Sequence, residues 1–187
     1  MTINYEQRDA FRLAGISVRT TNADETGPNG RLPELWGTYF QNPLSSEPGL
    51  QNRHLLYALY TDYESDASGE YTVVIGHECA EGVTESVEKQ QAAGVTESME
   101  KQQAAGVAES MRNLQVAAVP KARYMVFETP KGPFHETVPQ AWRDIWAYFG
   151  QSAVKRAFTG DFELYDFTQG DLEDTVVRIY IAVLSDS

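Results

Sequence analysis

A carboxylate inside an apolar, aromatic segment is the most informative chemical feature of this sequence. Glu163 lies in the segment Phe162-Glu163-Leu164-Tyr165-Asp166, which has the composition of a strand. Side chains two residues apart in a strand share a face, so Glu163 and Tyr165 point to the same side. Burying a charge is unfavourable unless it is compensated. The compensation is either structural, from Arg178 or a tyrosine hydroxyl, or functional, from a ligand.

Aromatic side chains supply the walls of a candidate pocket around this carboxylate. Tyrosine rings on a sheet face can stack on a ligand while their hydroxyls stay hydrated. Aromatic walls and a carboxylate suit a flat or cationic organic molecule, through stacking and cation–π contact. The candidate ligand-binding residues, besides Glu163 and Tyr165, are Trp36, Tyr57, Tyr60, Tyr71, Trp146 and Tyr180.

The elements that must position these residues occur in the same order twice. In each half the patterns predict a strand, a helix and then two strands. Pro33 and Pro139 suit the first turn of the two helices. The first half has a strand at 11–21, a helix at 32–40 and strands at 55–61 and 71–76. The second has a strand within 117–128, a helix at 138–149 and strands at 162–167 and 176–183.

The two halves also correspond residue by residue. Tyr57-Ala58-Leu59-Tyr60 matches Phe162-Glu163-Leu164-Tyr165, and the same offset places Val74 on Ile179. We therefore predict an α+β fold of two βαββ units, which share one antiparallel sheet with both helices on one face. Phe162 and Leu164 should pack under the helices. Glu163 and Tyr165 should then face a trough on the opposite side, across the pseudo-twofold axis.

A short tandem repeat separates the halves. Residues 82–93 recur at 94–105 with a period of 12, since 94 minus 82 is 12, and a diverged copy begins at Gly106. The predicted organisation is a single domain over 1–187, with half one at 1–81, the insertion at 82–105 and half two at 106–187. Because the period of 12 builds no single apolar stripe, a coiled coil is disfavoured. The segment is either an insertion without chemistry or a helical arm that mediates association or covers the groove.

Charge and composition exclude several classes of function. The 187 residues carry 15 Lys and Arg against 27 Asp and Glu, a formal net charge of -12, which repels a phosphate backbone. Direct binding to nucleic acid is therefore not expected. The only cysteine, Cys79, permits no disulfide framework, and no signal peptide or membrane-length apolar run is seen. The expected location is the cytoplasm.

Metal and cofactor signatures are also lacking. His77-Glu78-Cys79 alternates between two faces of a strand and has no evident further ligands, so no metal site is predicted. No phosphate-binding loop or dinucleotide fingerprint occurs, so no cofactor is expected. A homodimer or a separate regulatory partner is left open.

Several of these segments together resemble the GyrI-like superfamily. They include residues 11–21, 60–64, 69–76, 119–127, Trp142-Arg143-Asp144-Ile145-Trp146 and Asp161-Phe162-Glu163-Leu164-Tyr165. This superfamily includes the effector-binding domains of multidrug-responsive AraC- and MerR-type transcription activators. It also includes stand-alone integron-associated effector-binding proteins, which this chain resembles most. The resemblance implies a ligand groove at the pseudo-dyad and makes Glu163 the family's central acidic residue, which contacts cationic amphipathic drugs.

Three functions are therefore compared. The first is a stand-alone module that binds cationic or aromatic small molecules in a groove between the halves. The alternative is a hydrolase of strained, cyclopropane-bearing toxins, as the resemblance to hydrolytic relatives implies, with Glu163 as general base and Tyr165 as its partner. The third is an interaction protein whose working part is the tandem repeat.

Overall fold

The computed structural model describes residues 2–41, 44, 49–81, 83, 114–169 and 171–184. Almost the whole tandem repeat lies outside these residues, so the two interpretations of that segment remain predictions. The described helices are α1 (Asn22–Glu25), α2 (Leu32–Gln41) and α5 (Phe134–Gln151). The strands are β1 (Thr2–Arg8), β2 (Phe11–Thr21), β3 (Leu55–Thr61), β4 (Glu70–Glu78), β5 (Gln115–Val119), β6 (Ala122–Glu128), β7 (Asp161–Asp166) and β8 (Arg178–Val183).

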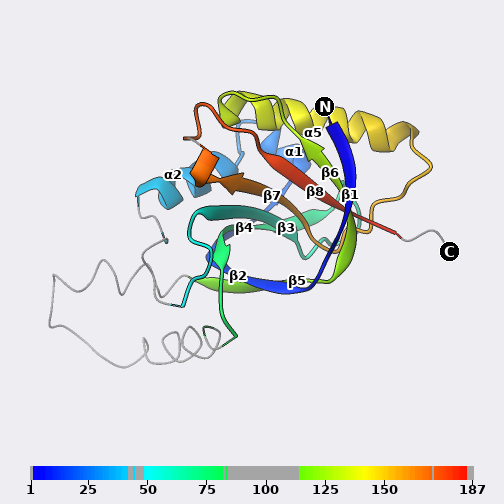
Figure 1. Cartoon of the computed structure of the whole chain (residues 1–187). Coiled ribbons are helices and arrows are strands. Elements are labelled where there is room, and N and C mark those ends of the chain that lie inside the picture. Colours follow the sequence, from blue (N-terminus) through cyan, green and yellow to red (C-terminus); the bar gives the residue numbers. More distant parts are fainter. Residues whose placement is uncertain are drawn as a thin grey trace, which may run out of the picture.

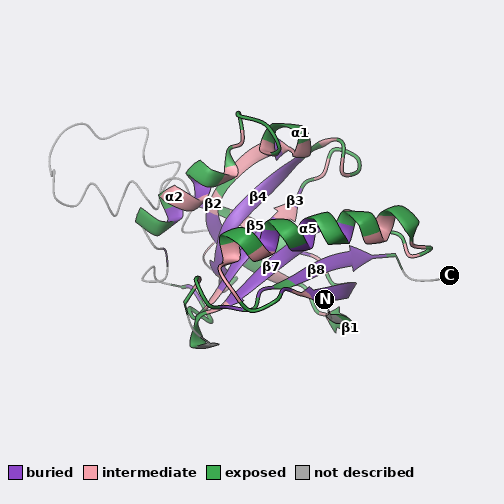
Figure 2. Cartoon of the chain, turned by 90° about the horizontal axis from the view of Figure 1, so that it is seen from above, coloured by how far each residue is buried: buried purple, intermediate pink, exposed green. Residues whose placement is uncertain are grey.

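All eight strands form one strongly curved antiparallel sheet (Figure 1), in the order β1-β6-β8-β7-β3-β4-β2-β5. The strands predicted for half one (β2, β3 and β4) are contiguous in this order, as are those for half two (β6, β7 and β8). Helices α2 and α5 lie on the same side of the sheet (Figure 2). The predicted α+β fold of duplicated βαββ units, with both helices on one face, is therefore confirmed.

The axis that relates the halves passes between β3 and β7. Ala58 on β3 stands directly opposite Glu163 on β7. These two residues are counterparts in the predicted duplication, at an offset of 163 minus 58, which is 105. A residue that pairs with its own counterpart marks a twofold axis, so Glu163 lies at the symmetric centre of the sheet.

The offset does not extend to the last strand. Val74 pairs with Leu59, whereas Arg178 pairs with Leu164, the counterpart of Leu59. The register equivalent of Val74 is thus Arg178, and the predicted match to Ile179 is wrong by one residue. A one-residue slip reverses the face of every side chain. Val74 and Ile179 accordingly lie in different buried clusters.

Strands β1 and β5 are not predicted by the sequence patterns. Each joins the opposite half: β1 pairs with β6, and β5 pairs with β2. The apolar residues of β1 give little burial signal, because Ile3 and Tyr5 are 40% and 47% exposed. Backbone pairing, rather than an apolar face, therefore defines this edge strand.

Helix α5 begins one turn earlier than predicted. The sequence places Pro139 in the first turn of a helix that starts at Val138, but the helix starts at Phe134 and contains Pro139 in its interior. Proline inside a helix lacks the amide hydrogen for one helical bond and costs about 3 kcal/mol relative to alanine. The added turn brings Phe134 and His135 into the wall of a cavity.

The predicted assignment of sheet faces is also wrong. Phe162 and Leu164 lie on the face away from the helices, in a buried cluster with Tyr57, Tyr124 and Tyr180. Curvature of the sheet closes this face, and Arg8 covers it with its guanidinium carbon 5.1 Å from the Tyr180 ring centroid. Glu163 and Tyr165 consequently face the helices, and the opposite face beneath them is filled by the buried cluster that includes Phe162 and Leu164.

Two glycines permit close contact between β2 and β4. Gly15 pairs with Gly76, and a Cβ at either position would lie 2.1–2.2 Å from a backbone carbonyl oxygen of the other strand. We expect Gly76→Ala to destabilise the protein by roughly 3 kcal/mol, because the clash involves backbone and cannot be relieved by a rotamer change. Urea denaturation measures the loss.

Gly37 provides the matched control for this prediction. It lies inside α2, and nothing lies within 4 Å of its added Cβ. Gly37→Ala should therefore stabilise the protein by about 0.5–1 kcal/mol, as alanine does in a helix interior. Equal stability of Gly76→Ala and wild type would show that β2 and β4 do not approach each other this closely.

Candidate functional site

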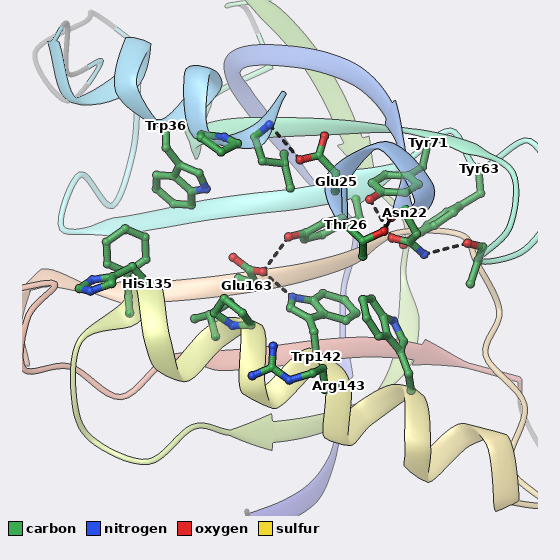
Figure 3. Close-up of a pocket in the computed structure, with 18 of the residues that line it drawn as sticks. Asn22, Glu25, Thr26, Trp36, Tyr63, Tyr71, His135, Trp142, Arg143 and Glu163 are labelled. Carbon is green, nitrogen blue, oxygen red and sulfur yellow. Dashed lines mark hydrogen bonds between the residues drawn. The ribbon is translucent and has the colours of Figure 1, made fainter. Parts of the chain in front are cut away.

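A cavity of about 670 Å³ lies on the helix side of the sheet. Its walls come from both predicted halves: α2 contributes Leu32 and Trp36, and α5 contributes Phe134, Trp142 and Trp146. The floor includes side chains of β3, β4 and β7. Figure 3 shows Glu163 at the centre, with Trp36 and Trp142 on opposite sides of it. The cavity has the size and the largely apolar lining of a small-molecule site.

Glu163 is 2% exposed and accepts three hydrogen bonds. The Tyr60 hydroxyl and the Trp142 indole N–H donate to Oε1 over 2.7 and 2.6 Å, and the Tyr165 hydroxyl donates to Oε2 over 2.6 Å. All three partners are neutral. Arg178, the cation considered from the sequence, instead lies 3.5 Å from Glu128 at the surface. The carboxylate is thus hydrogen-bonded by tyrosines but is not neutralised by Arg178.

Burial raises the pKa of Glu163 above its usual value of 4.5, whereas the hydrogen bonds from Tyr165, Trp142 and Tyr60 oppose this shift. Burial, together with the nearby Glu163, also raises the pKa of Tyr60, and the same two causes raise the pKa of Tyr165. Both hydroxyls therefore keep their protons at neutral pH and remain donors. The arrangement is a carboxylate held in place by neutral donors, with its charge uncompensated by them.

A second buried polar network adjoins the first. Asp161 is fully buried and accepts from Arg156 Nη2 at 2.5 Å and from the Tyr63 hydroxyl at 2.9 Å. The Arg156 guanidinium packs against the Trp142 ring, 5.9 Å from its centroid. The positive charge of this cavity-lining arginine is therefore already paired with Asp161 and is not available to Glu163.

The structure brings six of the eight candidate residues together. Glu163, Tyr165, Trp36, Tyr60, Tyr71 and Trp146 all line the cavity. The other two, Tyr57 and Tyr180, belong to the cluster on the opposite face. The Tyr57 hydroxyl donates to Glu78, and the Tyr180 ring stacks on Phe162 at 4.4 Å. In the predicted duplication Tyr57 is the counterpart of Phe162, and Phe162 points to the opposite face of its strand from Glu163. The duplication therefore already indicated that Tyr57 and Glu163 lie on different faces of the sheet.

Several cavity residues were not predicted. Trp142 is the most important, because its indole N–H contacts Glu163 directly. It precedes Trp146 by four residues and so shares the same helix face, a spacing that could have identified it. Tyr63 and Arg156 line the cavity from connecting segments, whereas Asn22 and Glu25 are the two ends of the short helix α1, which the sequence patterns do not predict.

Neither a metal centre nor a membrane-spanning helix is found in the described part of the chain. Across these ranges no three His, Cys, Asp or Glu side chains gather in a way that could hold a metal ion. No described helix is long and apolar enough to span a bilayer. His77 is buried and lies between the Tyr39 hydroxyl and the Leu55 carbonyl, at 2.9 and 2.7 Å.

Comparison with known proteins finds a matching family and similar chains. The model of the GyrI-like family, described as a GyrI-like small molecule binding domain, matches residues 1–184. The "Putative transcriptional regulator protein YobU" of Bacillus subtilis (strain 168) is 29% identical over 181 residues, which cover 94% of this chain and 93% of that protein.

Two solved structures are similar over nearly the whole chain. An integron cassette protein from the mobile metagenome of Vibrio cholerae is 27% identical with a TM-score of 0.68, covering 97% of this chain and 95% of that one. SAV2435, solved bound to tetraphenylphosphonium, is 18% identical with a TM-score of 0.67, covering 98% and 94%.

Proposed function

The chain belongs to the family of GyrI-like small molecule binding domains, and we propose that it binds cationic, aromatic organic molecules in the cavity between α2 and α5. The cavity would hold the ligand between the predicted halves, with Glu163 beneath it. Trp36, Tyr60, Tyr71, Trp142 and Trp146 would form the aromatic walls. Tyr57 and Tyr180 are not included, because they line the opposite face.

The observation that carries this proposal is the buried carboxyl group of Glu163, whose three hydrogen-bond donors carry no positive charge. The paired Arg156 is engaged by Asp161. A cation in the cavity would supply the missing positive charge in a setting where solvent screens it little. The indole and phenol rings would add cation–π attraction. The same fold in SAV2435 accommodates tetraphenylphosphonium, a lipophilic cation, which supports this ligand class.

Calorimetric titration with a panel of cationic and neutral aromatic dyes tests the proposal. We expect micromolar binding of the cationic dyes and weaker binding of neutral dyes of the same shape. If no cationic dye binds, or if neutral and cationic dyes bind alike, the proposed ligand class is wrong.

The pKa of Glu163 predicts how binding depends on pH. Because burial raises this pKa, the empty site takes up a proton more readily than an ordinary glutamate. A bound cation favours the carboxylate and lowers the pKa, so binding releases a proton when the free site is protonated. Affinity for a permanently charged dye should be constant above the raised pKa and fall by about tenfold per pH unit below it.

Titrations between pH 4 and pH 8, in paired buffers of different ionisation enthalpy, measure both the affinity and the proton release. Glu25, His135, Arg143 and Arg156 also line the cavity. Glu163→Gln separates their contribution, because it should remove the proton release that belongs to Glu163. The interpretation fails if the variant keeps the wild-type profile.

Hydrolysis of strained electrophiles is the second candidate. The contact of 2.6 Å between Tyr165 and Glu163 and the raised pKa of Glu163 favour it, because both suit a general base. However, Tyr165 directs its proton to the carboxylate and is not free to protonate a leaving group while it does so. Incubation with a cyclopropane-bearing toxin, followed by mass spectrometry, distinguishes the two functions by the presence or absence of a hydrated product.

A further inference from the structure

The two carboxyl oxygens of Glu163 are not equally occupied. Among the described residues, Oε1 accepts from Tyr60 and Trp142, whereas Oε2 accepts from Tyr165 alone. Each carboxylate oxygen has about two acceptor positions, so Oε1 is fully used and Oε2 keeps one. Figure 3 shows the doubly bonded oxygen on the side of Trp142 and the other oxygen turned toward the side of Trp36. A ligand cation would therefore meet Glu163 at Oε2.

Three aromatic residues adjoin the Oε2 side. Tyr165, whose hydroxyl donates to Oε2, has its ring centroid 5.4 Å from that of Trp36 and 5.9 Å from that of Phe134. The rings of Trp36 and Phe134 are 5.4 Å apart, and all three residues line the cavity. We call these three residues the aromatic triad. Such rings attract a cation that lies over their faces.

Groups of the protein already occupy much of the Oε1 side. The Tyr60 ring lies 5.0 Å from the Trp142 ring, and the Arg156 guanidinium lies over the Trp142 ring at 5.9 Å. The face of Trp142 that Arg156 covers is not available to a second cation. Trp146 follows Phe134 by 12 residues (146 minus 134), which is about 18 Å of rise along α5. The Oε1 side therefore suits the uncharged part of a ligand.

His135 also lines the cavity, next to Phe134 of the triad. Its ring nitrogens lie 3.8 Å from a carboxylate oxygen of Glu136 and 3.9 Å from one of Glu173. These two carboxylates offset any positive charge on His135. His135 therefore does not prevent a cation from binding at the triad.

We propose that the aromatic triad, together with Oε2 of Glu163, is the subsite for the cationic head of the ligand, and that the uncharged aromatic body extends toward Trp146. This inference rests on the proposed function. It makes Trp36 a residue that discriminates between charged and neutral heads, whereas Trp146 contacts the ligand without regard to charge. The ligand class becomes an aromatic molecule that carries its cation at one end.

Two isosteric probes and two tryptophan variants test this division of the cavity. The probes are naphthalene with a trimethylammoniomethyl group and its neutral neopentyl counterpart, titrated by fluorescence in the pH range where affinity no longer changes. Wild-type protein should bind the cationic probe at least tenfold more tightly. In Trp36→Leu this preference should fall by about three- to tenfold, the size of a cation–π contribution. A cooperative thermal transition confirms that the variant is folded.

Trp146→Leu is the matched control, because Trp146 also lines the cavity and does not belong to the triad. This variant should change the affinities for both probes by the same factor, so the preference stays within about twofold of the wild-type value. A preference that survives in Trp36→Leu, or that falls equally in both variants, would overturn the inference. Failure of both probes to bind wild type, or their equal binding, would instead overturn the proposed function.

Nuclear Overhauser effects on the wild-type protein give a second measurement that does not depend on the variants folding. The methyl protons of the trimethylammonium head should show contacts with the rings of Trp36 and Phe134. Contacts of the head with Trp146 in place of Trp36 would show that the ligand binds in the opposite orientation, and the proposed subsite would be wrong.

Discussion

Glu163→Gln is expected to weaken the binding of a cationic dye roughly ten- to hundredfold at neutral pH while the protein stays folded. The substitution keeps the shape of the side chain and removes its charge. The amide oxygen can still accept from Tyr60 and Trp142, and the amide nitrogen can donate to the Tyr165 oxygen. The loss of dye affinity therefore measures the contribution of the negative charge. A charge-assisted contact contributes about 1.5–3 kcal/mol.

Two controls make this result specific. Glu78 accepts hydrogen bonds from Tyr57 and Asn52 and is not among the cavity residues, so Glu78→Gln removes one negative charge elsewhere. Dye affinity should be nearly unchanged in Glu78→Gln. A neutral aromatic probe should bind wild type and Glu163→Gln alike. Equal losses in the two glutamine variants would mean that the net charge of the chain, rather than the cavity, attracts the dye.

The position of Glu163 at the centre of the fold could be predicted, but the face it occupies could not. The duplication aligns Ala58 with Glu163, and the structure pairs these two residues. Alternation along a strand shows which residues share a face. It does not show which of the two faces packs against the helices. The contact from Trp142 settles the question, and that contact depends on how α5 lies over the sheet.

The beginning of α5 shows a second limit of sequence patterns. Proline is common in the first turn of a helix, so the sequence pattern places the start of this helix next to Pro139. The helix instead begins at Phe134, and the Phe134 side chain packs against the buried core cluster. Tertiary packing here outweighs a local preference, and it does so in the segment that lines the cavity. Polar wall residues come from the four-residue helix α1, which includes Asn22, and from the connection between α5 and β7, which includes Arg156. Periodicity gives no information about segments this short.

Asp161→Asn is expected to destabilise the protein by about 3–5 kcal/mol, the second large effect we predict. Arg156 and Asp161 form an ion pair in which the side chains are 6% and 0% exposed. Arg156 Nε is buried with no hydrogen-bond partner. The buried guanidinium is therefore stabilised mainly by the hydrogen bonds that Nη2 donates to Asp161 and to the Tyr63 hydroxyl. Removing the carboxylate leaves a buried cation facing an amide, and breaking one side of a buried pair has a cost of this size.

The double variant Asp161→Asn, Arg156→Met distinguishes a buried-charge effect from simple loss of contacts. Methionine leaves no charge to compensate and keeps an apolar contact with Trp142 and Phe158, so the double variant should be more stable than Asp161→Asn alone. Urea denaturation of wild type, both single variants and the double variant gives the coupling energy. Asp9→Asn, which breaks the exposed pair with Lys121, should change the denaturation midpoint little. Additive losses in the cycle would show that Arg156 and Asp161 stabilise the cavity wall independently, and that the charge of one does not depend on the other.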